Sequence, residues 1–276
     1  IPSGTEIVCA LGFHEYLVGI SHECDFPLEI KDLPVCTKPR LNVNTSSLEI
    51  DKSVKSLLQN SLSIYAINEN VLKELKPDLI YIGGDVVHGK LDTSPEEVRM
   101  VANFFLELCK IAPTIIIPGN HDCNLNNKSR EDTLSPIVDL VQKITPNLHY
   151  WKKTGVYTMD NVDFATLSIF DIDKEGKQRT DTMPSPDNHR EQTKIALFHG
   201  GVDKHFYDNG FQVQDDRVTN ETFAGYDMVL LGDIHKRQFL NEEETIAYPG
   251  SLIQQNYSEE PSHGFLLWDV EKRKAT

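Results

Sequence analysis

The chain has 276 residues, 39% of them hydrophobic, and a formal net charge of −15. This composition suits one large or two small globular domains and excludes DNA binding through a broadly basic surface. No apolar run approaches the ~20 residues that a membrane-spanning helix needs, so no membrane partner is expected. Five cysteines without a Cys-x-x-Cys pair indicate a reducing, cytoplasmic setting and argue against a zinc–thiolate site.

The amino-terminal part of the chain is predicted to form a first α/β block over residues 1–82. Helices are expected over residues 5–11, 46–59 and 68–76, and a strand over residues 16–20. The second of these helices opens with a Ser-x-x-Glu capping box, and the third ends before a proline.

Four short apolar runs, Leu79–Ile82 being the first, end in polar side chains next to glycine. The four ends are Gly-Gly-Asp85, Pro-Gly-Asn120-His121-Asp122, His199-Gly-Gly and Gly-Asp233-Ile-His235. The carboxyl ends of strands in an open α/β sheet lie where ligands bind, and glycine lets backbones approach closely there. Amide, imidazole and carboxylate groups together suit a hard divalent cation that carries a phosphate. An ordinary polar turn explains one such end, whereas four coincident ends indicate a metal site.

The segments between these ends complete an α/β pattern. Ser94-Pro-x-Glu97 is a capping box that begins a helix to about Ile111, with one apolar face. A strand–helix–strand crossover then brings Asp85 and Asn120 to the same edge of a parallel sheet. A hairpin is expected over residues 157–168, with its turn at Asp160-Asn161. Residues 171–190 are expected to form a long polar loop near the site. Two late strands are expected at residues 248–252 and 265–270.

Segments of the first block carry a resemblance to the amino-terminal lobe of cobalamin-binding proteins that serve ABC importers. These segments are Pro2–Gly12, Leu17–Asp25, Leu33–Thr37 and Leu72–Ile80. The resemblance implies a partial, periplasmic-binding-protein-like α/β segment over residues 1–82. The first strand and the second lobe of that family are not in this sequence, so tight corrin binding is not expected.

A second resemblance covers residues from about 78 to 276, and the corresponding domain is predicted over residues 83–276. The matching segments are Gly84–Gly89, Pro118–Asp122, Phe198–Gly200, Gly232–His235, Tyr248–Leu252 and His263–Phe265. They resemble calcineurin-like metallophosphoesterases and, more narrowly, SbcD-type DNA exonuclease subunits, including phage versions. The resemblance implies a sandwich of mixed β-sheets flanked by helices.

The second resemblance also implies roles for the residues at the four strand ends. In the family pattern the position of Asp85 bridges two ions. Asn120, His199 and Asp233 then hold one of these ions, and His235 belongs to the other. His121 is not a ligand; it faces the phosphate and stabilises or protonates the leaving oxygen. Two divalent ions are expected, with Mn²⁺ preferred and Zn²⁺ and Fe²⁺ left open.

Two departures from the family pattern concern the second ion. Gly232-Asp-Ile-His235 stands where the family usually has Gly-His-x-His, which shifts metal preference. The opening strand of the family, which ends in Asp-x-His, is not in this sequence, so the ion at His235 keeps fewer ligands and lower occupancy. His22, Glu23 and Asp25 follow the predicted strand 16–20 and are candidate substitute ligands.

These residues predict a metal-dependent phosphodiester hydrolase, a DNA nuclease of the SbcD type whose activity is impaired by the missing motif. DNA is the expected substrate and an SbcC-type ATPase the expected partner, in DNA repair. Three alternatives stay open. They are a corrin-binding module, an inactive hybrid chain, and a phosphoesterase for small nucleotides or phosphoproteins, which the acidic composition suits better.

Overall fold

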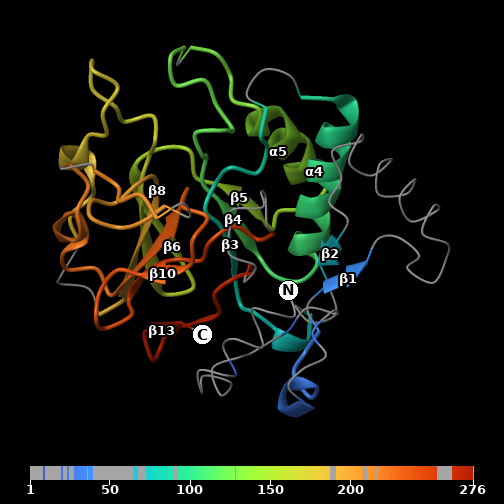
Figure 1. The fold of residues 1–276 in the computed structure, drawn as a ribbon. Helices are drawn as coiled ribbons and strands as arrows, with labels where there is room; N and C mark the ends of the chain where they lie inside the picture. Colours follow the sequence, from blue (N-terminus) through green and yellow to red (C-terminus); the bar gives the residue numbers. More distant parts are fainter. Residues whose placement is uncertain are drawn as a thin grey trace. The chain divides into compact units, whose positions relative to one another are not determined.

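The structure is a computed structural model. It describes residues 9, 20, 24, 28–35, 37–39, 65–67, 73–89, 93–127, 129–186, 191–207, 210–214, 217–253 and 263–275. The chain divides into two compact units, Ile1–Pro77 and Asp78–Thr276 (Figure 1). The predicted change of family after residue 82 stays a prediction, because compactness does not tell which family a unit belongs to.

The described part of the first unit is small. A 3₁₀ turn, η2 (Leu28–Ile30), precedes strand β1 (Thr37–Pro39), which pairs antiparallel with β2 (Tyr65–Ile67). Ile20 forms an isolated bridge with Val35. Cys9 and residues 73–75 are helical, within two of the predicted helices, whereas the predicted helix 46–59 lies outside the described residues.

The second unit contains a three-stranded parallel sheet with the order β3-β4-β5. Its strands are β3 (Ile80–Ile82), β4 (Thr114–Ile116) and β5 (Leu148–Tyr150). Helix α4 (Pro95–Cys109) connects β3 to β4, and helix α5 (Leu134–Gln142) connects β4 to β5. Because β3 and β4 are parallel and in register from residues 80 and 114, Asp85 and Asn120 follow the same edge of the sheet, as predicted.

Helix α4 begins where its sequence predicts and ends at Cys109, two residues before the predicted end at about Ile111. The Ser94 hydroxyl accepts the Glu97 N–H at 3.1 Å, and Pro95 occupies the first turn, where a missing N–H costs nothing. Val101, Phe105 and Leu108 are buried on one face. Because these apolar residues recur at helical spacing, their burial against the sheet stabilises the helix.

Helix α5 was not predicted, although its sequence carries a helical pattern. Its buried residues are Leu134, Ile137, Val138 and Val141, spaced as one face of a helix requires. The Asp132 carboxylate accepts the N–H groups of Leu134 and Ser135 at 3.1 and 2.8 Å. The capping residue therefore stands two positions before the first helical residue, and a search for a Ser-x-x-Glu box misses it.

A six-stranded sheet has the order β10-β11-β9-β8-β7-β6. Its strands are β6 (Gly155–Met159), β7 (Val162–Leu167), β8 (Thr193–His199), β9 (Met228–Gly232), β10 (Gln238–Phe239) and β11 (Ile246–Tyr248). The four inner strands are parallel, and β6 and β10 are antiparallel edges. The predicted hairpin β6–β7 is confirmed, with positive φ at Asp160 and Asn161, as a tight hairpin turn requires.

Alternate residues of the central strands enter different apolar layers, which makes the second unit a sandwich. Ile115 of β4 packs with Ile195 and Leu197 of β8 between the two sheets. Ile116 of β4 instead packs with the helices, which lie side by side against the outer face of β3–β5 in Figure 1. Phe198 of β8 joins a further cluster on the outer face of the six-stranded sheet. The predicted α/β sandwich of mixed sheets flanked by helices is confirmed.

The two late strands differ from their predicted ranges. Strand β11 shares only Tyr248 with the predicted strand 248–252, and it ends there because Pro249 cannot donate to a ladder and Gly250 has a φ of +79°. In the segment 265–270, only β12 (Trp268–Asp269) is a strand, and it pairs with β13 (Lys274–Ala275). Among the described residues, no helix combines the length and the hydropathy that crossing a bilayer requires.

Candidate metal centre

Glycines bring the ends of three strands of the second unit together. A Cβ atom on Gly84 would lie 2.6 Å from His199 Nδ1 and from the backbone nitrogen of Gly119. A Cβ on Gly119 would collide with the Asp85 carboxylate, and one on Gly232 would lie 3.0 Å from His199 Nδ1. Glycine is therefore required at these positions for the backbone to approach the imidazole ring.

Four of the predicted ligands meet at this junction. One side-chain atom each from Asp85, His199 and Asp233 lie within 4.8 Å of one another. His199 Nε2 is 3.4 Å from Asp85 Oδ2 and 3.7 Å from Asp233 Oδ1. It is also 3.1 Å from the side-chain amide of Asn120. Residues from β8 and from the loops after β3, β4 and β9 thus form one cluster.

A hydrogen bond between Nδ1 and the backbone of Gly83 fixes the orientation of the His199 ring. Its Nδ1 lies 2.5 Å from the Gly83 carbonyl oxygen, which can only accept a hydrogen bond. Nδ1 therefore carries a proton, and Nε2 is the ring atom that faces the carboxylates and, when it is unprotonated, offers a lone pair to a cation. Burial lowers the pKa of His199, but the hydrogen bond and charge of Asp85 outweigh it and raise that pKa above the usual value.

The side-chain amide of Asn120 lies within hydrogen-bonding distance of the Asp85 carboxylate. With its nitrogen toward Asp85, it donates to Oδ2 and Oδ1 at 3.1 and 3.2 Å. A half-turn of the amide presents the oxygen to the cluster instead, and that oxygen is the atom that binds a hard cation. The same side chain can thus serve the cluster with or without a bound ion.

The two aspartates of the cluster have unusual backbone conformations. Asp85 and Asp233 have φ angles of +54° and +93°, a region that residues with a Cβ rarely adopt. Such conformations cost on the order of 1–3 kcal/mol each and cluster at functional sites. Burial raises the pKa of the Asp233 carboxyl, and the nearby charge of Asp85 raises it further. A divalent cation between the two carboxylates would relieve their repulsion.

The sequence places Asp122 on one turn with Asn120 and His121, but in the structure its carboxylate binds backbone N–H groups and does not belong to the ligand cluster. It is fully buried. It accepts four backbone N–H groups at 2.8–3.1 Å, those of Asp85, Val86, Val87 and Gly119. Burial raises its pKa to about 6, against the lowering effect of the backbone donors. Asp122 is therefore ionised at neutral pH and ties the two ligand loops together, with no lone pair left for a metal.

His121 lies next to the cluster through its backbone. Its N–H donates to Asp85 Oδ1 at 2.7 Å, which helps to hold that carboxylate. Its ring stacks on the exposed ring of His88, with centroids 5.0 Å apart. Its Nδ1 is 3.2 Å from the His88 carbonyl oxygen, so Nδ1 carries a proton and Nε2 remains for substrate. The sequence did not predict the stacking of these two rings.

His235 is not a member of the three-residue cluster, although its charge lowers the pKa of Asp233. Its predicted place at a second ion stays a prediction. His22, Glu23 and Asp25 lie outside the described residues, so their predicted substitution for the missing ligands also stays a prediction.

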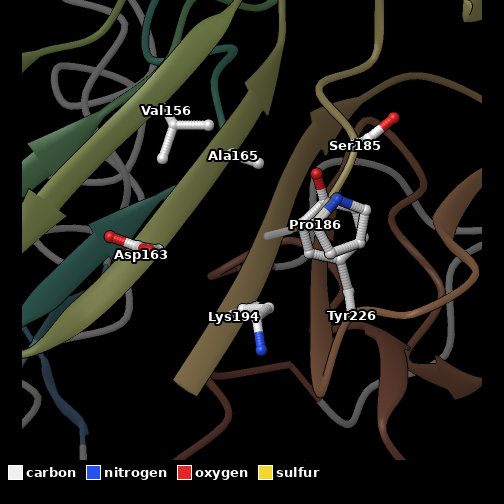
Figure 2. A pocket seen from close by; sticks show the side chains of 7 residues that line it. All are labelled: Val156, Asp163, Ala165, Ser185, Pro186, Lys194 and Tyr226. Atoms are coloured by element: carbon white, nitrogen blue, oxygen red, sulfur yellow. The ribbon is translucent and has the colours of Figure 1, made fainter. Parts of the chain in front are cut away.

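A pocket of about 220 Å³ lies elsewhere on the six-stranded sheet (Figure 2). Val156, Asp163, Ala165 and Lys194 of β6–β8 line it together with Ser185, Pro186 and Tyr226. Lys194 is near the start of β8 and His199 is at its end, ~16 Å apart at the usual rise of a strand. The pocket is therefore separate from the ligand cluster.

The donor set of the cluster fits a divalent transition-metal ion. It offers one imidazole nitrogen, two carboxylates and an amide oxygen within one small volume. Such mixed sets bind Mn²⁺, Fe²⁺ or Zn²⁺, and only softer ions call for thiolates.

Comparison with known proteins agrees with this arrangement. The family model described as Calcineurin-like phosphoesterase matches residues 59–237. The chain therefore belongs to the calcineurin-like phosphoesterase family, which supports a metal-dependent phosphoester hydrolase. Metallophosphoesterases bind a dinuclear divalent metal site, and the side chains of the cluster at Asp85 lie close enough together to hold a metal ion.

Three relatives illustrate the range of similarity. An uncharacterized protein of Acanthamoeba polyphaga mimivirus is 43% identical over 71% of this chain and 15% of its own length. A protein of Invertebrate iridescent virus 6 named "Putative phosphoesterase" is 24% identical over 69% of this chain and 63% of its own. The DNA double-strand break repair protein Mre11 of Nanoarchaeum equitans is 24% identical over 79% of this chain and 62% of its own.

The chain thus spans less than two thirds of each of these relatives. The family match begins at residue 59, well before the predicted change of family after residue 82. These matches give no support to the resemblance of residues 1–82 to cobalamin-binding proteins.

Proposed function

We propose that the chain is a Mn²⁺-dependent phosphodiester hydrolase that cuts DNA. The observation that carries the proposal is the meeting of Asp85, Asn120, His199 and Asp233 at strand ends far apart in sequence. DNA as substrate is supported by the relative named as a DNA double-strand break repair protein. An SbcC-type ATPase partner belongs to the same proposal and rests on the SbcD-type sequence motifs.

The side chains of the cluster have distinct tasks in this proposal. Asp85, Asn120, His199 and Asp233 hold the cation, which when bound activates a water and neutralises charge on the phosphate. His121 holds a proton on Nδ1 against the His88 carbonyl, so its Nε2 is free to face the leaving oxygen. Glycines 84 and 119 keep the loops close enough for all of these groups to reach one phosphate.

The second ion of the proposed site has fewer predicted protein ligands than the first. Within the sequence given, His235 and the bridging Asp85 are the predicted protein ligands for it, with His22, Glu23 and Asp25 as candidate substitutes. Two protein ligands hold an ion less tightly than four, so we expect this ion to bind more weakly than the first. Binding of one ion per chain at low Mn²⁺ concentration, and of two at high concentration, is the corresponding expectation.

A phosphoesterase for small nucleotides is the second candidate. The formal net charge of −15 favours it, because a polyanion such as DNA is repelled by an acidic surface, whereas one small phosphate is repelled less. Like the DNA nuclease, this candidate uses the same cluster, so substrate comparison and not metal binding distinguishes the two.

Turnover of three substrates by the purified chain tests the proposal. A linear DNA duplex, a cyclic nucleotide and an aryl phosphate diester are each incubated with Mn²⁺, beside the variants Asp85→Asn and Asp181→Asn. Asp181 is an exposed carboxylate with an arginine partner and serves as a control. The expected result is Mn²⁺-dependent loss of the duplex that Asp85→Asn reduces at least ~100-fold and Asp181→Asn leaves unchanged.

Other outcomes would assign the chain differently. Turnover of the cyclic nucleotide without loss of the duplex would refute the DNA nuclease and favour the small-nucleotide enzyme. Mn²⁺ binding without turnover of any substrate would favour the inactive hybrid chain. Absence of Mn²⁺ binding would refute the Mn²⁺-dependent hydrolase, and absence of Mn²⁺, Fe²⁺ and Zn²⁺ binding would refute the metal centre itself.

A further inference from the structure

One short segment, residues 248–251, contacts two of the loops that carry the candidate metal ligands. The first contact comes from the side chain of Tyr248, at the end of β11. Its hydroxyl donates to the Gly200 carbonyl at 2.7 Å and accepts the Val202 N–H at 3.0 Å. Gly200 directly follows His199, so the phenol holds the turn that leaves the histidine.

The second contact comes from the backbone of the same segment. The Ser251 N–H donates to the His235 carbonyl at 3.1 Å. Gly250 has a φ of +79°, and a Cβ there would lie 2.6 Å from that same carbonyl oxygen. The segment therefore lies directly against the loop that carries Asp233 and His235, and only glycine permits this approach.

The strand pairing explains why one segment reaches both loops. Strand β11 runs parallel to β9, with Ala247 opposite Leu230, so Tyr248 comes level with the end of β9 just before Asp233. The Gly200 N–H also donates to the Gly232 carbonyl at 3.3 Å, which links the ends of β8 and β9. Tyr248 thus sits beside the point at which both ligand-bearing strands end.

Burial makes the Tyr248 hydrogen bonds obligatory. The side chain is fully buried in the outer cluster of the six-stranded sheet, with Phe198 and Val202 in the same cluster. Val202 is also fully buried, so its N–H left without an acceptor costs about 1–3 kcal/mol. The turn after His199 is therefore held in one arrangement as long as the phenol is present.

We propose that Tyr248 is a positioning residue for the metal centre. Its hydroxyl fixes the turn after His199, and residues 249–251 fix the loop after Asp233, so that both ligands face one cation. Tyr248 touches neither substrate nor metal and acts through these two loops. The inference rests on the proposed metal site and adds a residue that the ligand pattern does not contain.

Mn²⁺ affinity, measured by calorimetric titration of the full chain, tests this role independently of activity. Tyr248→Phe removes the hydroxyl and keeps the ring, and loss of such outer partners typically weakens metal binding by about 10–100-fold. Tyr226→Phe is the matched control, because the Tyr226 hydroxyl donates to the Pro184 carbonyl and its side chain lines the separate pocket of Figure 2. We expect both variants to melt at a lower temperature, but only Tyr248→Phe to bind Mn²⁺ more weakly.

A second pair of variants tests the backbone contact and remains informative if Tyr248→Phe does not fold. Gly250→Ala adds a methyl group against the His235 carbonyl, and we expect it to weaken Mn²⁺ binding. Gly176→Ala is its control, because Gly176 has the same φ of +79° and no described atom lies within 4 Å of the position that its added Cβ would take. The two variants thus share the backbone strain and differ in the contact.

Three outcomes decide the matter. Weaker Mn²⁺ binding in folded Tyr248→Phe than in its control, or in Gly250→Ala if Tyr248→Phe does not fold, supports the positioning role. Wild-type affinity in folded Tyr248→Phe, or in Gly250→Ala if the first does not fold, overturns it while leaving the proposed function intact. A wild-type chain that binds no Mn²⁺ overturns the proposed function and the positioning role together.

Discussion

The Asp122 carboxylate accepts the backbone N–H of Asp85 at 2.8 Å, although the two residues are 37 positions apart in the chain. The same carboxylate oxygen accepts the Gly119 N–H at 2.8 Å. The loops after β3 and β4 are therefore joined by one buried anion, and the candidate bridging ligand depends on a residue that binds no metal.

Replacing that anion by a neutral amide is expected to loosen both loops. In Asp122→Asn the amide group can accept from only one side, so at least one pair of buried N–H groups loses its acceptor. We expect about 3 kcal/mol of lost stability in chemical denaturation, together with weaker Mn²⁺ binding.

The control for this variant is Asp181→Asn, which also removes one carboxylate but from an exposed position. It should change neither the denaturation midpoint nor Mn²⁺ affinity. If Asp122→Asn were as stable as the wild type and bound Mn²⁺ equally well, the Asp122 carboxylate would have no part in forming the site.

A second prediction concerns Gly119, because a Cβ at this position would collide with the Asp85 carboxylate. The added methyl group in Gly119→Ala would displace that carboxylate, so we expect Mn²⁺ affinity to fall by at least ~10-fold. Gly155→Ala is a suitable control, since its Cβ would meet nothing closer than a Tyr157 ring carbon at 3.9 Å. Equal Mn²⁺ affinity in both variants would show that Asp85 is not the ligand.

The strand-end positions of the candidate ligands could be predicted from sequence because they depend on local features. An apolar run, a glycine and a polar residue fix where a strand ends, and parallel pairing places such ends together. Asp85, Asn120, His199 and Asp233 meet for this reason. The capping box at Ser94 and the turn at Asp160 were likewise readable from a few neighbouring residues.

The supporting contacts could not be predicted in the same way. The bonds from Asp122 to residues 85–87 and from Tyr248 to residues 200 and 202 join segments 35 or more positions apart. No spacing rule links such residues, since their proximity exists only once both sheets have formed. The strand predicted at 248–252 is wrong beyond Tyr248 for a related reason: the turn at Gly250 packs against the His235 carbonyl.

From the stacking of His88 on His121, we expect removal of the His88 ring to impair catalysis without impairing metal binding. Removing the His88 ring in His88→Ala leaves its backbone carbonyl and the ligand cluster in place, but frees the His121 ring to turn. We expect a kcat about 10-fold lower with unchanged Mn²⁺ affinity. A fall in Mn²⁺ affinity in this variant would place His88 in the metal site instead.

The buried carboxylate of Asp132 predicts how stability depends on pH. It lies 2.5 Å from Lys152 Nζ and accepts the hydroxyls of Ser135 and Tyr150 at 2.6 and 2.9 Å. Burial raises its pKa, but these partners, Lys152 first, outweigh burial and hold the pKa below the usual aspartate value of 3.8. Because the folded state favours the ionised form, Asp132 stabilises the fold above pH 3.8, and that stability is lost as pH falls through the lower folded pKa.

Denaturant unfolding at about pH 5 and about pH 3 checks this dependence. The wild type should lose more stability between these two values than Asp132→Asn, which has no carboxylate to protonate but is less stable at the higher pH. Asp139→Asn, an exposed change on the same helix α5, should follow the wild type. If the wild type and Asp132→Asn lost equal stability on acidification, the Lys152 partnership would not depress the pKa of Asp132, and acid sensitivity would arise at other carboxyls.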